Sequence, residues 1–243
     1  MAGHSKWANI KHRKGAQDAK RGKVFTKIIK EITVAARIGG SEIESNPRLR
    51  KAITNAKSNN MPAENIERAI KKGSGSLPGV NYEEVFYEGY GPSGVAIMLE
   101  VITDNKNRSV AEIRHAFSKF DGNLGENGSV SWIFEKKGLI RLKLNNSIEE
   151  NLYEIAINSG AEDIAQNDDD FIIKVHPDNL LKLKDLLEKD GLKILSYNIT
   201  MIPKTYQTLK ENELEKIIAL LEILENNDDV IGIYSNLKIK ENK

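Results

Sequence analysis

The chain has 243 residues and carries 36 Lys and Arg against 35 Asp and Glu, a net charge of +1. It contains no cysteine, which excludes disulfides, Cys-ligated zinc and thiol catalysis. No apolar run approaches the roughly 20 residues of a membrane-spanning helix, and the N-terminus lacks the apolar core of a secretory signal.

The charges are distributed unevenly along the chain. Residues 1–80 hold 17 Lys and Arg and 6 Asp and Glu, a net charge of +11, whereas residues 81–243 hold 19 and 29, a net charge of −10. Such asymmetry indicates a segment that binds a polyanion, joined to an acidic remainder.

The first segment in chain order is a basic arm. Residues 1–21 contain few apolar side chains and cannot build a core, so we expect them to be mobile or extended when no partner is bound. From Gly22 onward apolar residues recur at helical spacing, which predicts a helix over 22–38 that Gly39-Gly40 ends.

Two more short helices are predicted before a linker. Asn46 is the expected N-cap of the second helix, with Pro47 at its first position. Pro62 opens the third helix, and the Gly/Ser-rich segment 73–79 reads as a linker. Residues 1–79 are therefore predicted to form a basic arm, a three-helix domain and its linker.

After residue 80 the apolar period becomes that of strands. Strands are predicted over 84–90 and 95–103, joined by the turn at Gly91-Pro92, and another over 130–134. Between them Ser109 and Glu112 have the spacing of a capping box at the start of a helix.

The far C-terminus contains the same kinds of element. It is predicted to run from a strand around 198–206, through a helix over 211–226, to a strand over 229–239. Residues 80–137 and 198–243 would then form one discontinuous ferredoxin-like βαββαβ domain.

Residues 138–197, between these two parts, repeat the pattern. A strand over 139–144 precedes a helix capped by Ser147 and Glu150, and a hairpin over 163–175 follows. Pro177 then starts a helix, and 192–197 forms a strand. The predicted fold class is α+β: the helical domain followed by two ferredoxin-like modules, one nested in the other.

No converging set of catalytic or metal-binding groups can be read from the sequence. The four histidines (His4, His12, His115 and His176) have no metal-ligand spacing, and His115 is expected to be a semi-buried helix residue. Asp168 to Asp170 fit a solvated hairpin tip. We therefore predict no enzyme activity, no catalytic residue, no metal and no cofactor.

Two Gly-rich stretches have a composition similar to that of ligand-binding loops. Residues 88–94 precede a β-branched apolar run, so they fit a hairpin turn and not a dinucleotide-binding loop, which must open a helix. Residues 121–128 are longer than a plain turn requires, which leaves contact with a partner open.

The basic arm is the predicted binding site, and nucleic acid is the predicted partner. Residues 1–30 hold nine Lys and Arg and one acidic residue, Asp18. Binding to phosphates releases counterions, and Trp7 offers a face for base stacking. For Trp7, an anchor that pins the arm to the helices remains the alternative. The predicted contact residues are His4, Lys6, Trp7, Lys11, His12, Arg13, Lys14, Lys20, Arg21, Lys23 and Lys27.

Long segments of the chain resemble the YebC/PmpR family. They are GHSKWANIKHRKGAQDAKRGK at 3–23, the run from Tyr87 to Trp132, and FEKKG at 134–138. The resemblance implies a cytoplasmic bacterial protein with a helical N-terminal domain and two α/β domains. It also implies a DNA-binding transcriptional regulator without enzymatic activity. Mitochondrial relatives are translational activators, and some bacterial members act on ribosomes and relieve stalling.

We therefore predict a non-enzymatic nucleic-acid-binding regulator. The family resemblance favours DNA and transcription, whereas a penetrating arm without a clear helix-turn-helix favours ribosomal RNA and translation. The acidic α/β part would serve as a spacer, as a docking surface for the ribosome or a regulatory protein, or as a repellent that limits wrapping. No small-molecule substrate and no membrane contact are predicted.

Overall fold

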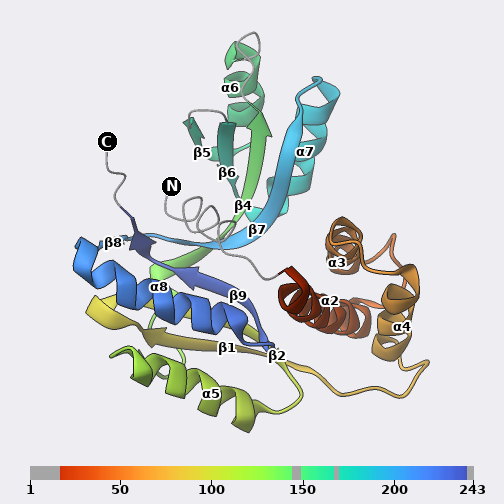
Figure 1. Ribbon diagram of the computed structural model, residues 1–243. Helices are drawn as coiled ribbons and strands as arrows, with labels where there is room; N and C mark the ends of the chain where they lie inside the picture. Colours follow the sequence, from red (N-terminus) through yellow and green to blue (C-terminus); the bar gives the residue numbers. More distant parts are fainter. Residues whose placement is uncertain (1–16, 144–148, 167–169, 240–243) are drawn as a thin grey trace. The chain divides into compact units, whose positions relative to one another are not determined.

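A computed structural model describes residues 17–143, 149–166 and 170–239 of the chain (Figure 1). The chain divides into two compact units, one made of residues 1–132 and 205–243 and the other of residues 133–204. The smaller unit contains the residues of the insertion predicted at 138–197. It begins earlier, at residue 133, and ends later, at residue 204. The predicted α+β class is confirmed.

The larger unit begins with the three predicted helices: α2 (Gln17–Gly39), α3 (Pro47–Ser58) and α4 (Ala63–Gly73). The prediction for the start of α2 was wrong: residues 17–21, expected to be mobile or extended, are helical, because Ala, Lys and Arg favour helix and Gly22 does not interrupt it. The Asn46 side chain accepts a hydrogen bond from the Leu49 amide (3.0 Å), and its own amide donates to Ala35 O and Gly40 O. Asn46 therefore caps α3 and also ties that cap to the end of α2.

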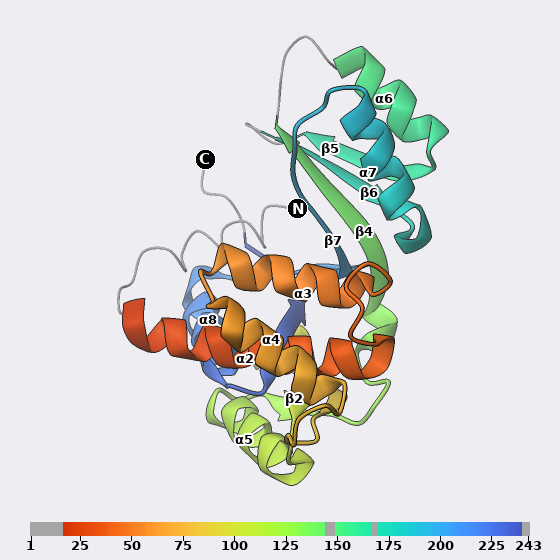
Figure 2. The same cartoon turned by 90° about the vertical axis from the view of Figure 1, so that its right-hand side faces the viewer.

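The apolar stripes of these helices form a core of their own. Ile32, Leu49 and Ala56 are fully buried in it, together with Ile28, Ala36, Ile53, Ile66 and Ala69. Figure 2 shows α3 running antiparallel to α2, so the end of α3 and the start of α2 lie at the same end of this small bundle. The polar faces of the helices are left on its surface.

The rest of the larger unit is a four-stranded antiparallel sheet with two helices. Its strands are β1 (Glu83–Tyr90), β2 (Ala96–Thr103), β3 (Asn123–Leu124) and β9 (Val230–Ser235), in the order β3–β1–β2–β9. The helices are α5 (Lys106–Lys119) and α8 (Glu211–Asn226). A short parallel pair, β8 (Gln207–Thr208) with β10 (Leu237–Lys238), completes the unit.

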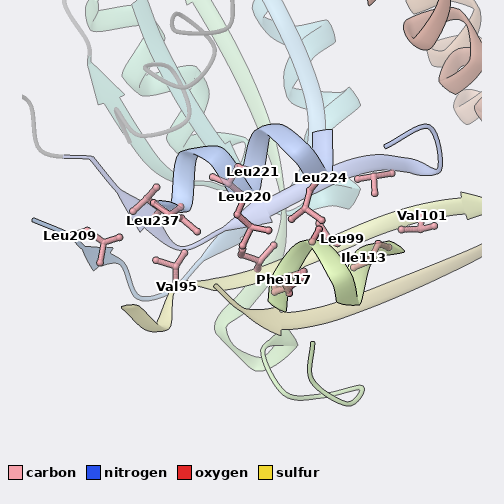
Figure 3. Close-up of a cluster of buried hydrophobic side chains, with 14 residues drawn as sticks. Val95, Leu99, Val101, Ile113, Phe117, Leu209, Leu220, Leu221, Leu224 and Leu237 are labelled. Carbon is pink, nitrogen blue, oxygen red and sulfur yellow. The ribbon is translucent and has the colours of Figure 1, made fainter. Parts of the chain in front are cut away.

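Helices α5 and α8 cover one face of this sheet. Figure 3 shows Phe117 of α5 and Leu220 and Leu224 of α8 directed toward Leu99 of β2. All four side chains are at most 1% exposed. Segments more than 100 residues apart in sequence therefore share this core, which is why the domain is discontinuous.

The order of elements in this sheet differs from the predicted βαββαβ. The chain runs β1–β2–α5–β3 and later α8–β9. The strand predicted around 198–206 does not join this sheet. Residues up to Pro203 instead continue a strand of the smaller unit, because no turn interrupts the extended chain between Ile194 and Pro203.

Two local predictions in the larger unit were also wrong. Helix α5 begins one turn before Ser109, with Asn105 as its N-cap, because the Asn105 side chain accepts from the Arg108 amide (3.0 Å). The strand predicted over 130–134 is instead a 3-10 turn at Ser131–Ile133, because Glu88 holds the amides of Val130 and Ser131.

The smaller unit has the predicted ferredoxin-like order of elements. It runs β4 (Phe134–Lys143), α6 (Glu149–Asn158), β5 (Ala161–Gln166), β6 (Asp170–Val175), η3 (Pro177–Asn179), α7 (Leu180–Lys189) and β7 (Ile194–Pro203). The sheet is antiparallel in the order β5–β6–β4–β7. The predicted Ser147–Glu150 cap lies outside the described residues, as do Asp168 and Asp169.

Candidate nucleic-acid interface

The predicted contact residues fall into three groups by position. His4, Lys6, Trp7, Lys11, His12, Arg13 and Lys14 lie outside the described residues. Lys20 and Arg21 belong to the start of α2, but their side chains also lie outside the described part. Only Lys23 and Lys27 have described side chains, so the structure places two of the eleven.

Lys23, Lys27 and Lys30 form a row along one face of α2. Lys23 Nζ donates to Asn226 O (2.8 Å) and Lys27 Nζ donates to Glu225 O (2.6 Å), both at the C-terminal end of α8. The last carbonyls of a helix lack partners within it and carry partial negative charge, which lysines stabilise. The two lysines predicted to bind phosphate therefore also hold α2 against α8.

The third lysine of the row ends in a buried charge cluster around Asp229. Lys30 forms an ion pair with Asp229 Oδ1, and both residues are buried. Ser109 Oγ (2.5 Å) and Arg108 Nη2 (3.1 Å) donate to Asp229 Oδ2. Burial acts to raise the pKa of Asp229, but these donors outweigh it and lower the pKa to about 2.

Ser109 therefore has a different role from the predicted helix cap. Its hydroxyl is fully buried and is also within 2.7 Å of Thr103 Oγ1. The serine thus links α5 and β2 to the Asp229 cluster, which contains Lys30 of α2. No spacing rule in the sequence could reveal a contact between residues 120 positions apart.

A second charge cluster links the three-helix bundle to the sheet. Arg48 of α3 donates to Glu31 of α2 (2.8 Å) and to Glu84 of β1 (2.9 Å). The hydrogen bond to Glu31 raises the pKa of the Arg48 guanidinium above its usual value, against the opposing effect of burial. Arg48 is therefore occupied inside the molecule and is a poor candidate for phosphate contact.

The Gly-rich stretch 121–128 is organised from within the protein. The carboxylate of Glu88 accepts hydrogen bonds from the amides of Gly128, Val130 and Ser131, at 2.7 to 2.9 Å. Burial acts to raise the pKa of Glu88, but these donors outweigh it and the pKa lies below its usual value. The other stretch, 88–94, forms the predicted turn between β1 and β2.

Helix α3 presents a basic face that the sequence prediction did not include among the contact residues. No Asp or Glu occurs between Glu44 and Glu64. The exposed polar side chains of the helix are Arg50, Lys51, Thr54, Asn55, Lys57 and Ser58. The signal that could have found this face is the acid-free run itself, combined with the apolar stripe at Leu49, Ala52, Ile53 and Ala56.

Other site types receive no support from the described residues. Among them, no group of His, Asp and Glu is arranged to hold a metal ion. His115 is exposed on α5, where partial burial was expected. No helix of the described ranges is long and apolar enough to cross a membrane.

Two family models together match most of the chain. The model for the TACO1/YebC protein N-terminal domain matches residues 5–76, and the model for the TACO1/YebC second and third domain matches residues 82–237. These ranges correspond to the three-helix part and to the α/β part of the fold.

Similar proteins from several bacteria match the whole chain. A probable transcriptional regulatory protein of Desulforapulum autotrophicum is 52% identical over 241 residues, which cover 99% of this chain and 98% of the relative. One of Persephonella marina is 54% identical over 243 residues, 99% and 97% of the two chains. The crystal structure of a conserved hypothetical protein from Aquifex aeolicus has a TM-score of 0.82 at 49% identity and covers 98% of both chains.

Proposed function

Because the chain belongs to the TACO1/YebC family, we propose that it is a regulatory protein that acts by binding nucleic acid and not by catalysis. The family and the names of its relatives support a regulatory role. In this proposal the basic N-terminal segment grips phosphates, and the protein works in the cytoplasm, where a bacterial regulator meets its nucleic acid.

One observation carries this proposal: the separation of charge along the chain. The first 30 residues hold nine Lys and Arg and one acidic residue. Seven of the eleven proposed contact residues precede α2 in the sequence, in a segment with few apolar side chains. The contacts of Lys23 and Lys27 with α8 make these two lysines secondary in the proposal.

DNA is the target that the names of the relatives favour, since transcriptional regulators act on promoters. A second candidate is an RNA-binding translation factor at the ribosome. It is supported by the acidic side chains of α4. This helix follows α3 after a short turn, in the position of the reading helix of a helix-turn-helix. However, Glu64 lies in its first turn and Glu67 in the next, and their carboxylates would repel the phosphates that line the major groove of DNA.

The two candidates can be separated in cells. Crosslinking the full-length protein to its bound nucleic acid, followed by sequencing, should recover either discrete promoter DNA or ribosomal RNA in bulk. The first result would support transcriptional regulation and exclude the ribosomal role, and the second would do the reverse. Recovery of neither above a mock sample would contradict the whole proposal.

Phosphate gripping by the arm predicts a strong dependence on salt. Replacing Lys6, Lys11, Arg13 and Lys14 together by Gln should reduce the slope of log affinity against log salt by up to about 3, at ~0.7–0.9 for each lost phosphate contact. The measurement is nucleic-acid affinity across a salt series. A variant with Lys182, Lys189, Lys193 and Lys204 changed to Gln removes the same charge from other parts of the chain and serves as the control. An unchanged slope in the arm variant would refute the arm as the gripping element.

A further inference from the structure

We propose that the exposed face of α3 is a second nucleic-acid contact, and that it binds the minor groove of double-helical RNA. This inference rests on the proposed function and assigns a surface and a ligand to it. Of the two candidate targets, RNA is the one that this face fits.

The face has a simple arrangement of charge. A helix turns by about 100° for each residue, so the buried stripe around Ala52 and Ala56 leaves Thr54 and Ser58 on the midline of the opposite side. Arg50 and Lys57 flank this midline on one side, and Lys51 and Asn55 flank it on the other. All six side chains are exposed.

The cations of this face are not neutralised by neighbouring carboxylates. In the described part of the chain, the ammonium groups of Lys51 and Lys57 make no hydrogen bond or ion pair, and Arg50 donates to the carbonyl oxygens of Ile43 and Glu44. By contrast, Arg48 and Arg108 of the same unit are paired with carboxylates. The α3 face is therefore positioned to exchange counterions for phosphates.

The two hydroxyl groups on the midline favour RNA over DNA. Thr54 Oγ1 donates to Arg50 O (2.9 Å) and Ser58 Oγ donates to Thr54 O (3.0 Å). Each hydroxyl proton is thereby used inside the helix, so the hydroxyl oxygens face outward as acceptors. A ribose 2′-hydroxyl can donate to them, whereas the sugar–phosphate backbone of DNA has no donor to offer.

The shape of the surface fits the same target. An α-helix on the side of a bundle presents a broad convex face. The minor groove of A-form RNA is wide and shallow and displays the 2′-hydroxyls, whereas its major groove is too narrow for side chains to read. The C-terminal end of α3 and the start of α2 lie at one end of the bundle (Figure 2), so RNA on this face would lead toward the start of α2, which the arm precedes in the sequence.

The test uses the full-length protein with an RNA duplex and a DNA duplex of the same sequence. Changing Thr54→Val together with Ser58→Ala should lower affinity for the RNA duplex about 5-fold and leave affinity for the DNA duplex unchanged. Substituting 2′-deoxy residues in the RNA should remove the difference between wild type and this variant. Lys51→Gln with Lys57→Gln should lower RNA affinity about 10-fold and reduce the salt slope by about 1.5.

Matched controls separate these effects from general charge and stability. Lys71→Gln with Lys72→Gln removes the same charge from the exposed end of α4 and should change RNA affinity less than 2-fold. Both hydroxyls are exposed, so the melting temperature should stay within a degree or two of wild type. Equal loss in the α3 and α4 lysine variants would overturn the α3 assignment.

The outcomes also distinguish this inference from the proposed function. Loss of binding in the arm variant, with the α3 variants unaffected, would overturn the α3 face and leave the arm in place. Loss in the α3 variants, with the arm variant unaffected, would refute the arm and keep the RNA contact. A DNA duplex bound more tightly than RNA, with the hydroxyl variant weakening both equally, would overturn the choice of RNA.

Discussion

Deleting residues 2–21 should abolish most nucleic-acid affinity and leave the folded core intact. The deletion removes six of the nine Lys and Arg found in the first 30 residues. Losing several phosphate contacts at physiological salt should weaken binding by about 100-fold or more. The measurement is the affinity of wild type and truncated protein for the same oligonucleotide at fixed salt.

The expectation of an intact core follows from where the core begins. Among the side chains of α2 that the structure describes, the first that pack in the bundle are Phe25 and Ile28, which lie after the deleted segment. Unfolding should therefore show the same midpoint for both proteins within a degree or two. A truncated protein that is stable and still binds with full affinity would contradict the role of the arm. A truncated protein that melts early would instead reveal that the arm, through Trp7, anchors itself to the helices.

Replacing Asp229 by Ala should destabilise the larger unit by about 3–5 kcal/mol. The change removes the carboxylate that pairs with buried Lys30 and accepts hydrogen bonds from Ser109 and Arg108. Breaking a buried pair by removing one partner leaves an uncompensated charge, which is the expensive case. Chemical denaturation at neutral pH measures the loss. Asp228→Ala, which changes an exposed neighbour, is the matched control and should change stability by less than about 0.5 kcal/mol.

The same aspartate predicts the direction of the pH dependence. Its pKa is lowered in the folded state from 3.8 to about 2, so the ionised form stabilises the fold. This stabilisation, about 2 kcal/mol, is fully present above about pH 4 and is lost as the pH falls through 2. The stability difference between wild type and Asp229→Asn should therefore shrink between pH 4 and pH 2. A difference that stays constant over that range would contradict the assignment.

The lysines of α2 form contacts inside the protein that the sequence alone does not predict. Lys23 and Lys27 bond to the last carbonyls of α8, and Lys30 is buried against Asp229. In the sequence all three look alike, as members of a basic run that faces solvent or phosphate. Only the pairing of segments about 200 residues apart shows which cation is structural.

Local rules of the sequence were sufficient for the existence of the three N-terminal helices and for the order of elements in the smaller unit. The three N-terminal helices depend on periodicity, on the Asn46-Pro47 start and on glycine stops, all of which act over a few residues. The βαββαβ order of the smaller unit also follows from consecutive elements. The position of the basic arm likewise depends only on composition.

Tertiary structure alone decided the features that depend on distant partners. Ser109 looked like a cap because its neighbours fit the pattern, yet its hydroxyl is directed to Asp229. Residues 198–203 belong to the smaller sheet because they pair with residues 134–139 of β4, a choice between two sheets that alternation cannot make. Short-range patterns determine which residues form an element, whereas the partners of that element, and of its charges, are determined by packing between segments that the sequence keeps far apart.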